Sequence, residues 1–222
     1  MRTPAIEVLG SQTVWQSYTR LDVVRYRVRG FDGAMRPERS WEVFVRGPAA
    51  GMLPYDPITD QVLLIEQFRY PALRAGIDPV LMEIPGGFME AGETPEQAAT
   101  RKMREETGCA IDLTERIGHF ILSAGGSDET ATIFAGRIAA PHAGPDGIVG
   151  YGGLAQEHED LRIRIMPADD AIASALAGLY ANSITTIALL WLAQRRDWLR
   201  AQWTQTGIPT GTETITVRGD AA

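Results

Sequence analysis

Two neighbouring carboxylates, Glu105 and Glu106, fall near the C-terminal end of a segment with helical sequence signals. The negative end of the helix dipole lies there, so adjacent acidic side chains are unfavourable unless a cation offsets their charge. Clusters of carboxylate oxygens bind hard divalent cations such as Mg²⁺ and Mn²⁺, and these cations also bind phosphate oxygens. The pair therefore predicts metal-assisted chemistry on a phosphate-containing substrate.

The helix that carries these carboxylates has clear boundaries in the sequence. Thr94-Pro95-Glu96-Gln97 is a capping box with proline at the first helical position. Gly108 is placed to adopt the left-handed conformation that ends a helix. The sequence thus predicts a helix over residues 95–107. Lys102 lies three and four residues before the two carboxylates, so it shares their face of this helix.

Residues 87–109 resemble the Nudix box, Gly-x5-Glu-x7-Arg-Glu-U-x-Glu-Glu-x-Gly-U, in which U is an aliphatic residue. The matching positions are Gly87, Glu93, Arg101, Met103, Glu105, Glu106 and Gly108, and Cys109 stands at the final aliphatic position. An exposed charged helix would reproduce so many fixed positions only rarely. The resemblance implies the Nudix fold, a mixed β-sheet sandwiched between helices in an α/β (α+β) architecture. The alternation of strand and helix signals along the chain agrees with it.

Lys102 departs from the box, which has a second glutamate directly after Arg101. It is the single lysine among 21 Lys and Arg residues, so it looks like a change from glutamate to lysine. In the family that glutamate commonly binds metal, which an ammonium group is unable to do. Lys102 is placed to pair with Glu105 and Glu106 as a built-in substitute for one metal ion. The chain is then a weakened or inactive hydrolase, or else the remaining carboxylates still bind enough metal.

Further segments resemble the ADP-ribose pyrophosphatase-like branch of the family, which also contains hydrolases acting on GDP-mannose. They are residues 62–69, 83–87, 123–129 and 153–160, within a resemblance that spans 15–203. It implies hydrolysis of the diphosphate of a nucleoside diphosphate sugar, first of all ADP-ribose to AMP and ribose 5-phosphate, with Mg²⁺ or Mn²⁺ as cofactor. The alternatives are a catalytically silent Nudix domain that binds ADP-ribose or a related nucleotide, and GDP-mannose as the substrate.

The same resemblance implies roles for individual residues. The metal ligands are the backbone carbonyl of Gly86 and the carboxylates of Glu105, Glu106 and Glu159. The catalytic candidates are Glu157, which resembles the residue that activates the attacking water, Glu105 and Arg101. The substrate-binding candidates are Arg69 at the diphosphate or terminal ribose, Tyr18 and Trp41 at the base, Arg46 and Glu83.

Several of these residues also have a purely structural interpretation. Arg101 would then only support the loop before the helix, by pairing with Glu93 or Glu105. Tyr18 would pack as an ordinary strand residue. Glu157 and Glu159 would belong to a solvated loop.

Three parts of the chain are expected. Residues 1–47 form a small β-region with alternating strand patterns and the turn signal Asp32-Gly33. Because this region is too thin to hold a core, it is expected to pack on the main domain or on a second copy of the chain. The resemblance implies that it is exchanged within a homodimer. Residues 48–203 are the expected Nudix domain, closed by helices near 168–179 and 184–202, the second capped by Ser183. Residues 204–222 are a partly loose tail.

Composition limits the partners and the compartment. With 222 residues, 45% of them hydrophobic, the chain can bury a sizeable core. Its net charge of −7 argues against nucleic acid as a partner. The longest apolar stretch, residues 184–193, is too short to span a bilayer, and no signal-peptide pattern follows Met1. A single cysteine, Cys109, fits a reducing compartment. A cytoplasmic protein without a membrane partner is therefore expected.

Overall fold

The computed structural model describes residues 5–154 and 158–205. The chain divides into an N-terminal unit, Met1–Pro48 with Phe120–Thr130, and a main unit, Ala49–His119 with Ala131–Ala222. The predicted loose tail lies outside the described residues except for its first two. Within the described ranges, no helix is long and apolar enough to cross a membrane.

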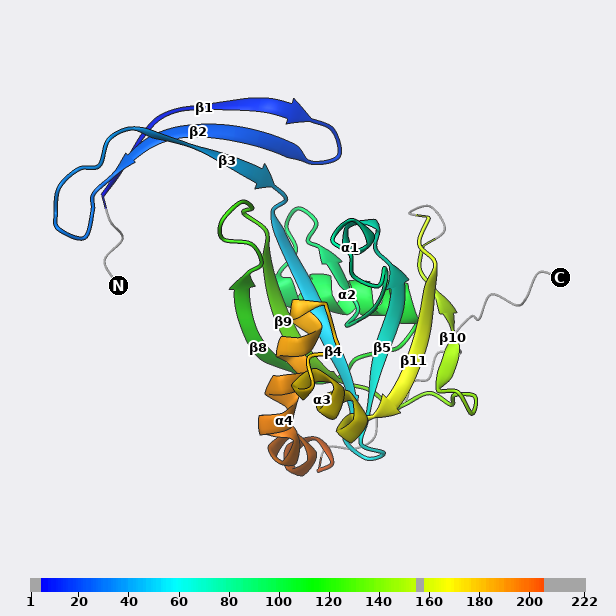
Figure 1. The fold of residues 1–222 in the computed structure, drawn as a ribbon. Coiled ribbons are helices and arrows are strands. Elements are labelled where there is room, and N and C mark those ends of the chain that lie inside the picture. Colours follow the sequence, from blue (N-terminus) through cyan, green and yellow to red (C-terminus); the bar gives the residue numbers. More distant parts are fainter. Residues whose placement is uncertain (1–4, 155–157, 206–222) are drawn as a thin grey trace. The chain divides into compact units, whose positions relative to one another are not determined.

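The N-terminal unit is built on a three-stranded antiparallel sheet (Figure 1). Its strands are β1 (Ile6–Gln16), β2 (Arg20–Val28) and β3 (Arg39–Val45), in the order β1-β2-β3. Gly33 has a φ of 87° in the turn between β2 and β3, where the Asp32 carboxylate accepts the Ala34 N–H. The small antiparallel β-region predicted from the alternating pattern is confirmed.

The main unit is built on an eight-stranded mixed sheet with the order β10-β11-β5-β4-β9-β8. These strands are β4 (Pro48–Asp56), β5 (Gln61–Phe68), β8 (Thr114–Ile121), β9 (Thr130–Arg137), β10 (Ile148–Gly152) and β11 (Leu161–Pro167). Two short strands complete it: β6 (Val80–Glu83) pairs with β5, and β7 (Gly86–Phe88) pairs with β4.

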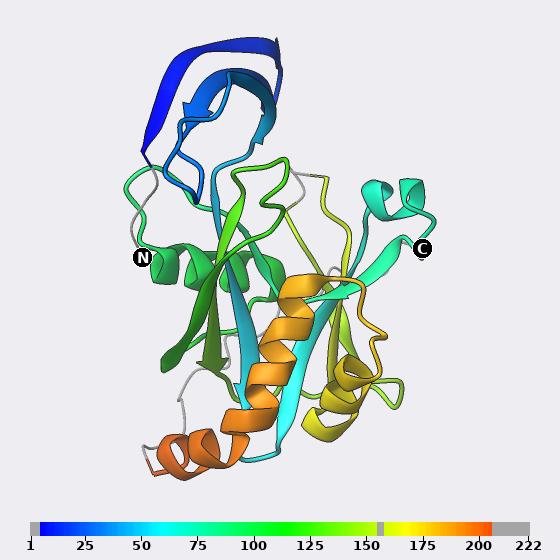
Figure 2. The same cartoon turned by 60° about the vertical axis from the view of Figure 1, so that its left-hand side comes forward.

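Helices cover both faces of this sheet (Figures 1 and 2). Helix α2 (Pro95–Thr107) lies on one face, and α3 (Ala168–Leu176) and α4 (Ser183–Trp203) lie on the other. Helix α1 (Tyr70–Arg74) is a short turn of helix between β5 and β6. The predicted α/β architecture, with a mixed sheet between helices, is thus confirmed.

The packing of the core explains why the sequence of β5 contains a continuous run of apolar residues. Its residues Val62–Ile65 are at most 2% exposed, because a central strand is covered on both faces. Leu63 and Ile65 pack with Ala98 and Met103 of α2, and the alternation of side chains turns the intervening residues to the opposite face. Helix α2 is therefore held in place by the core beneath it.

The local sequence signals predicted both ends of α2 correctly, but they misplaced the start of α4 by one residue. The Thr94 hydroxyl accepts the Gln97 N–H, the Gln97 side chain accepts the Thr94 N–H, and Gly108 has a φ of 70°. The expected cap Ser183 is wrong, since Ser183 is already the first helical residue of α4. The cap is Asn182, which is extended and whose side chain accepts the Thr185 N–H at 3.1 Å.

Candidate active site

Glu106 lies at the end of α2 against the short strand β7. Its carboxylate is buried, and Oε2 accepts the backbone N–H of Gly86 at 3.1 Å. Only glycine fits at position 86, because a side chain there would come within 2.6 Å of the Ala50 carbonyl oxygen on β4. The close pairing of β7 with β4 therefore holds the Gly86 backbone against the carboxylate.

A second carboxylate, Glu159, lies near Glu106. Its Oε2 accepts the Leu154 N–H at 3.2 Å, which anchors it to the strand end after β10. Burial and the nearby charge of Glu159 raise the pKa of Glu106 to about 8. The Gly86 N–H, Lys102 and Arg69 act in the opposite direction. Two carboxylates from segments far apart in the sequence thus lie close enough for the charge of Glu159 to oppose ionisation of Glu106.

Arg101 binds the loop before α2. Its guanidinium donates to both carboxylate oxygens of Glu93, at 2.7 and 2.8 Å, and to the Phe88 carbonyl at 3.2 Å. It also donates to Glu105 at 3.2 Å. The hydrogen bonds from Arg101 hold the pKa of Glu93 at about 2. This geometry favours the structural interpretation of Arg101, since its donors are engaged in holding the loop and Glu105.

Lys102 lies on the same face of α2 as the carboxylates. Its ammonium is 3.2 Å from Glu105 Oε2, and its side chain is 9% exposed. Its charge lowers the pKa of Glu106. The expected partners of Lys102 were Glu105 and Glu106: the ion pair with Glu105 is present, and towards Glu106 the structure gives an effect of its charge.

Arg69 and Glu83 form a directional ion pair in which only the carboxylate is buried. Arg69, at the end of β5, donates to both oxygens of Glu83 on β6, the shortest distance being 2.6 Å. The Asn182 side chain donates to Glu83 Oε1 at 2.9 Å. Glu83 is 4% exposed, whereas the Arg69 side chain is 44% exposed. Glu83 and Asn182 therefore orient a guanidinium that remains accessible to an anion.

Asn182 did not stand out in the sequence. Its signal was its place directly before a predicted helix, where asparagine is a favoured cap. One side chain thus begins α4 and orients Glu83.

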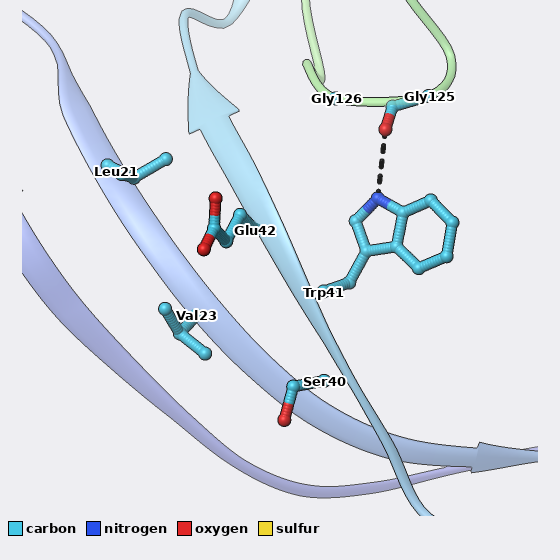
Figure 3. A pocket seen from close by; sticks show the side chains of 7 residues that line it. All are labelled: Leu21, Val23, Ser40, Trp41, Glu42, Gly125 and Gly126. Atoms are coloured by element: carbon cyan, nitrogen blue, oxygen red, sulfur yellow. Dashed lines mark hydrogen bonds between the residues drawn. The ribbon is translucent and has the colours of Figure 1, made fainter.

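Three predicted substrate contacts belong to the N-terminal unit. Tyr18, in the turn between β1 and β2, is 86% exposed. Arg46 is paired with Glu129 at 3.0 Å. The indole of Trp41 donates to the Gly125 carbonyl at 3.0 Å (Figure 3).

A pocket of about 510 Å³ lies beside Trp41 within this unit. Its walls come from β2, β3 and the loop at 125–126: Leu21, Val23, Ser40, Trp41, Glu42, Gly125 and Gly126 (Figure 3). The loop is bound to β3, because Phe44 donates its N–H to the Gly126 carbonyl at 2.8 Å and accepts the Ser127 hydroxyl at 2.9 Å. The Trp41 indole is therefore held in one wall of the pocket, next to both polar and apolar side chains.

Whether a divalent cation fits the candidate active site can be judged from the charges and partners of its carboxylates. Glu106 and Glu159 are hard oxygen donors, and a cation would relieve their mutual repulsion. Glu105 differs, because Arg101 and Lys102 already neutralise it. No group of three or more acidic, His or Cys side chains among the described residues is arranged to hold a metal. Glu157, the predicted base, lies outside the described residues. The described residues thus offer a cation two carboxylates, Glu106 and Glu159, and its further ligands would have to come from other groups.

Comparison with known proteins agrees with this arrangement. The family model described as NUDIX domain matches residues 45–190. The chain therefore belongs to the Nudix family, and it is a hydrolase of that family.

The chain is also similar to individual hydrolases of this family. It is 35% identical to an ADP-ribose pyrophosphatase of Escherichia coli (strain K12), over 89% of this chain and 92% of that protein. It is 31% identical to an ADP-ribose pyrophosphatase of Haemophilus influenzae, over 89% and 90% of the two chains. A GDP-mannose pyrophosphatase of Yersinia enterocolitica is 31% identical over 72% of this chain and 80% of its own. A solved structure described as an ADP compounds hydrolase shares the fold, with a TM-score of 0.63 and 17% identity, over 91% of this chain and 97% of that chain.

Proposed function

We propose that this protein hydrolyses the diphosphate of a nucleoside diphosphate sugar, with ADP-ribose as the substrate and AMP and ribose 5-phosphate as the products. The observation that carries the proposal is the pair of neighbouring carboxylates, the buried Glu106 and the half-buried Glu159, beside an oriented and accessible Arg69. The 35% identity to an ADP-ribose pyrophosphatase supports ADP-ribose, and GDP-mannose is the second candidate substrate.

Glu106, Glu159 and the Gly86 carbonyl are the proposed ligands of Mg²⁺ or Mn²⁺. Such a cation supplies charge neutralisation at the diphosphate when it is bound. Arg69 binds the diphosphate, because a guanidinium forms paired hydrogen bonds with phosphate oxygens. Glu83 and Asn182 hold that guanidinium in orientation. Glu157 takes the proton of the attacking water, as its place in the motif implies.

The N-terminal unit is proposed to bind the base. Trp41 and Tyr18 offer aromatic faces, and the pocket beside Trp41 has room for a nucleobase-sized group. Arg46 is a further candidate residue for binding the negatively charged groups of the substrate. We also propose that residues 1–47 are exchanged within a homodimer, that 48–203 form the catalytic domain, and that the protein works in the cytoplasm.

The test is release of nucleoside monophosphate from ADP-ribose and from GDP-mannose, each with Mg²⁺ and with Mn²⁺. We expect AMP from ADP-ribose, and a loss of about a hundredfold in kcat/KM for Glu106→Gln, because the cation would lose a charged ligand. Asp197→Asn, an exposed change on α4, is the matched control and should keep the parent rate.

A second candidate function, nucleotide binding without turnover, is favoured by one observation: Lys102 pairs with Glu105 in the candidate active site. Binding of ADP-ribose measured by calorimetry, with no product under any metal condition, would replace the hydrolase proposal by this one.

A further inference from the structure

Lys102 is a buried cation in a site that otherwise gathers carboxylates. Its side chain is only 9% exposed, while its ammonium lies 3.2 Å from Glu105 Oε2. A buried ammonium is costly unless a counter-charge accompanies it. Glu105 supplies that counter-charge, so the lysine belongs to the electrostatics of the site rather than to the protein surface.

The backbone provides room for the lysine stem. A side-chain carbon on Gly87 would approach Lys102 Cε within 2.8 Å and Cδ within 3.2 Å. The methylene chain therefore lies against the bare backbone of β7. This contact directs the ammonium along α2 towards Glu105 and not outward into water.

The two carboxylates at the end of α2, Glu105 and Glu106, consequently differ in charge balance. Glu105 is bonded by Arg101 at 3.2 Å and by Lys102 at 3.2 Å. Glu106 is buried, its carboxylate accepts the neutral Gly86 N–H at 3.1 Å, and the charge of Glu159 lies nearby. A divalent cation gains most where negative charge is least compensated. Binding is therefore favoured at the Glu106–Glu159 side and opposed at Glu105.

We propose that Lys102 is a permanent internal cation that neutralises Glu105, so that the site binds fewer divalent cations than it would with a carboxylate at position 102. This inference rests on the proposed function, because it assumes that Glu106 and Glu159 bind metal. According to this proposal, the side chain of Lys102 controls how many metal ions the chain binds.

The first experiment counts Mn²⁺ bound per chain, without substrate, from the electron paramagnetic resonance signal of the free ion. We expect Lys102→Glu to bind one more Mn²⁺ per chain than the parent protein, because a repelling charge becomes an oxygen ligand. We expect Lys102→Met, which keeps the stem against Gly87, to keep the parent stoichiometry and to tighten Kd by about tenfold through lost repulsion. Arg104→Glu, the same charge reversal at an exposed position of α2, is the control and should keep the parent stoichiometry.

A second experiment uses the fact that the chain has one lysine. With ¹⁵N-labelled lysine, the side-chain ammonium gives a single signal that needs no assignment. We expect this signal to stay protected from solvent exchange when Mg²⁺ is added, because the ion pair with Glu105 persists.

Two results would overturn the proposal: equal Mn²⁺ binding by the parent, Lys102→Glu and Lys102→Met proteins, or release of the lysine signal into rapid exchange on adding Mg²⁺. If Lys102→Glu fails to fold, the tighter Kd expected of Lys102→Met and the lysine signal still test whether the charge of Lys102 opposes metal binding, and an unchanged Kd would overturn the proposal. Hydrolysis of ADP-ribose is measured separately. A changed stoichiometry without turnover would support this inference and refute the proposed function, whereas turnover with unchanged stoichiometry would do the opposite.

Discussion

Arg101 shows how one side chain joins the loop before α2 to the helix itself. It contacts the carboxylates of Glu90, Glu93 and Glu105, and it also donates to the Phe88 carbonyl. A planar guanidinium makes such simultaneous contacts with little loss of conformational freedom, whereas an ammonium does not. The loop that precedes the candidate metal ligands is therefore held by the shape of arginine as well as by its charge.

Replacing Arg101 by lysine should show how much the planar shape of the guanidinium contributes to stability. We expect Arg101→Lys to lower the free energy of unfolding by about 1–3 kcal/mol, since charge-assisted hydrogen bonds are lost while the charge stays. Urea denaturation measures it. Arg104→Lys, at an exposed position of the same helix, should change stability by less than about 0.5 kcal/mol. Equal effects of the two changes would contradict this role of Arg101.

Among elements, α2 matters most because it carries Lys102, Glu105 and Glu106. Its first turn is closed by the reciprocal bonds of Thr94 and Gln97, and the core holds its inner face. The end of the helix is stopped by Gly108 in the left-handed region. These capping contacts fix which residue stands at which turn, and so which side chains share the face of α2 that carries Lys102 and Glu105.

The cap of α2 gives an element-scale prediction. Thr94→Ala should cost about 1 kcal/mol of unfolding free energy, because the Gln97 N–H loses its acceptor. Thr100→Ala, in the interior of the same helix, should be near neutral, since alanine is the better helix former. Thermal unfolding of both variants measures the difference. A larger loss for Thr100→Ala would mean that packing, and not the cap, holds this end of the helix.

The turn between β4 and β5 is joined to α4 by Asp60. Its Oδ1 accepts the Tyr55 hydroxyl at 2.7 Å and Arg196 Nε at 2.8 Å, and Oδ2 accepts from Arg200 at 3.2 Å. Arg196 also binds Asp169 of α3. Hydrogen bonds from Arg196, followed by those from Tyr55, hold the pKa of Asp60 below its usual value against the effect of burial. The cluster connects a turn with two helices.

A pH dependence follows from that lowered pKa. The ionised Asp60 stabilises the fold above its unfolded pKa of about 3.9, and this contribution is lost as the pH falls through the folded pKa. We expect Asp60→Asn to cost about 1–3 kcal/mol at neutral pH and less below about pH 4. Urea denaturation across this range, with the exposed Asp170→Asn as control, measures it. A difference that does not change with pH would contradict the assignment.

At the scale of the whole molecule, the N-terminal sheet lacks a core of its own. Ile6, Val8, Val14 and Trp15 of β1 are each at least half exposed. Burying such side chains is worth about 1.5–3 kcal/mol each, so a surface of this kind favours association. This supports the proposed homodimer.

The dimer is tested by sedimentation. We expect a mass of twice 24.2 kDa for the parent chain, and a shift towards the monomer for Val8→Asp, because a charge would be buried at the contact. Ser11→Asp, on the same strand, is the polar control. A monomeric parent would refute the dimer, and a Val8→Asp protein that remains dimeric would place the contact on another surface.

Local sequence patterns determined much of the fold. The capping box, the stop at Gly108 and the apolar run of β5 depend on neighbouring residues, so α2 and the central strands were predictable. The elements that were missed, α1 and β10, are short and contain proline or glycine, and local propensity is weak there. The cap at Asn182 was misplaced by one residue because serine and asparagine are equally good caps.

Motif spacing named most of the candidate site, but the tertiary structure decided how its residues meet. The sequence placed Lys102 beside Glu105, because i, i+3 pairs on a helix always adjoin. It contained no sign that Asn182 would bind Glu83, 99 positions earlier. Only the family resemblance, which made both residues metal ligands, implied that Glu159 lies near Glu106. Such contacts depend on how strands and helices pack into one core, and no local pattern encodes that packing. The charge balance that separates Glu105 from Glu106 therefore became visible only in the folded chain.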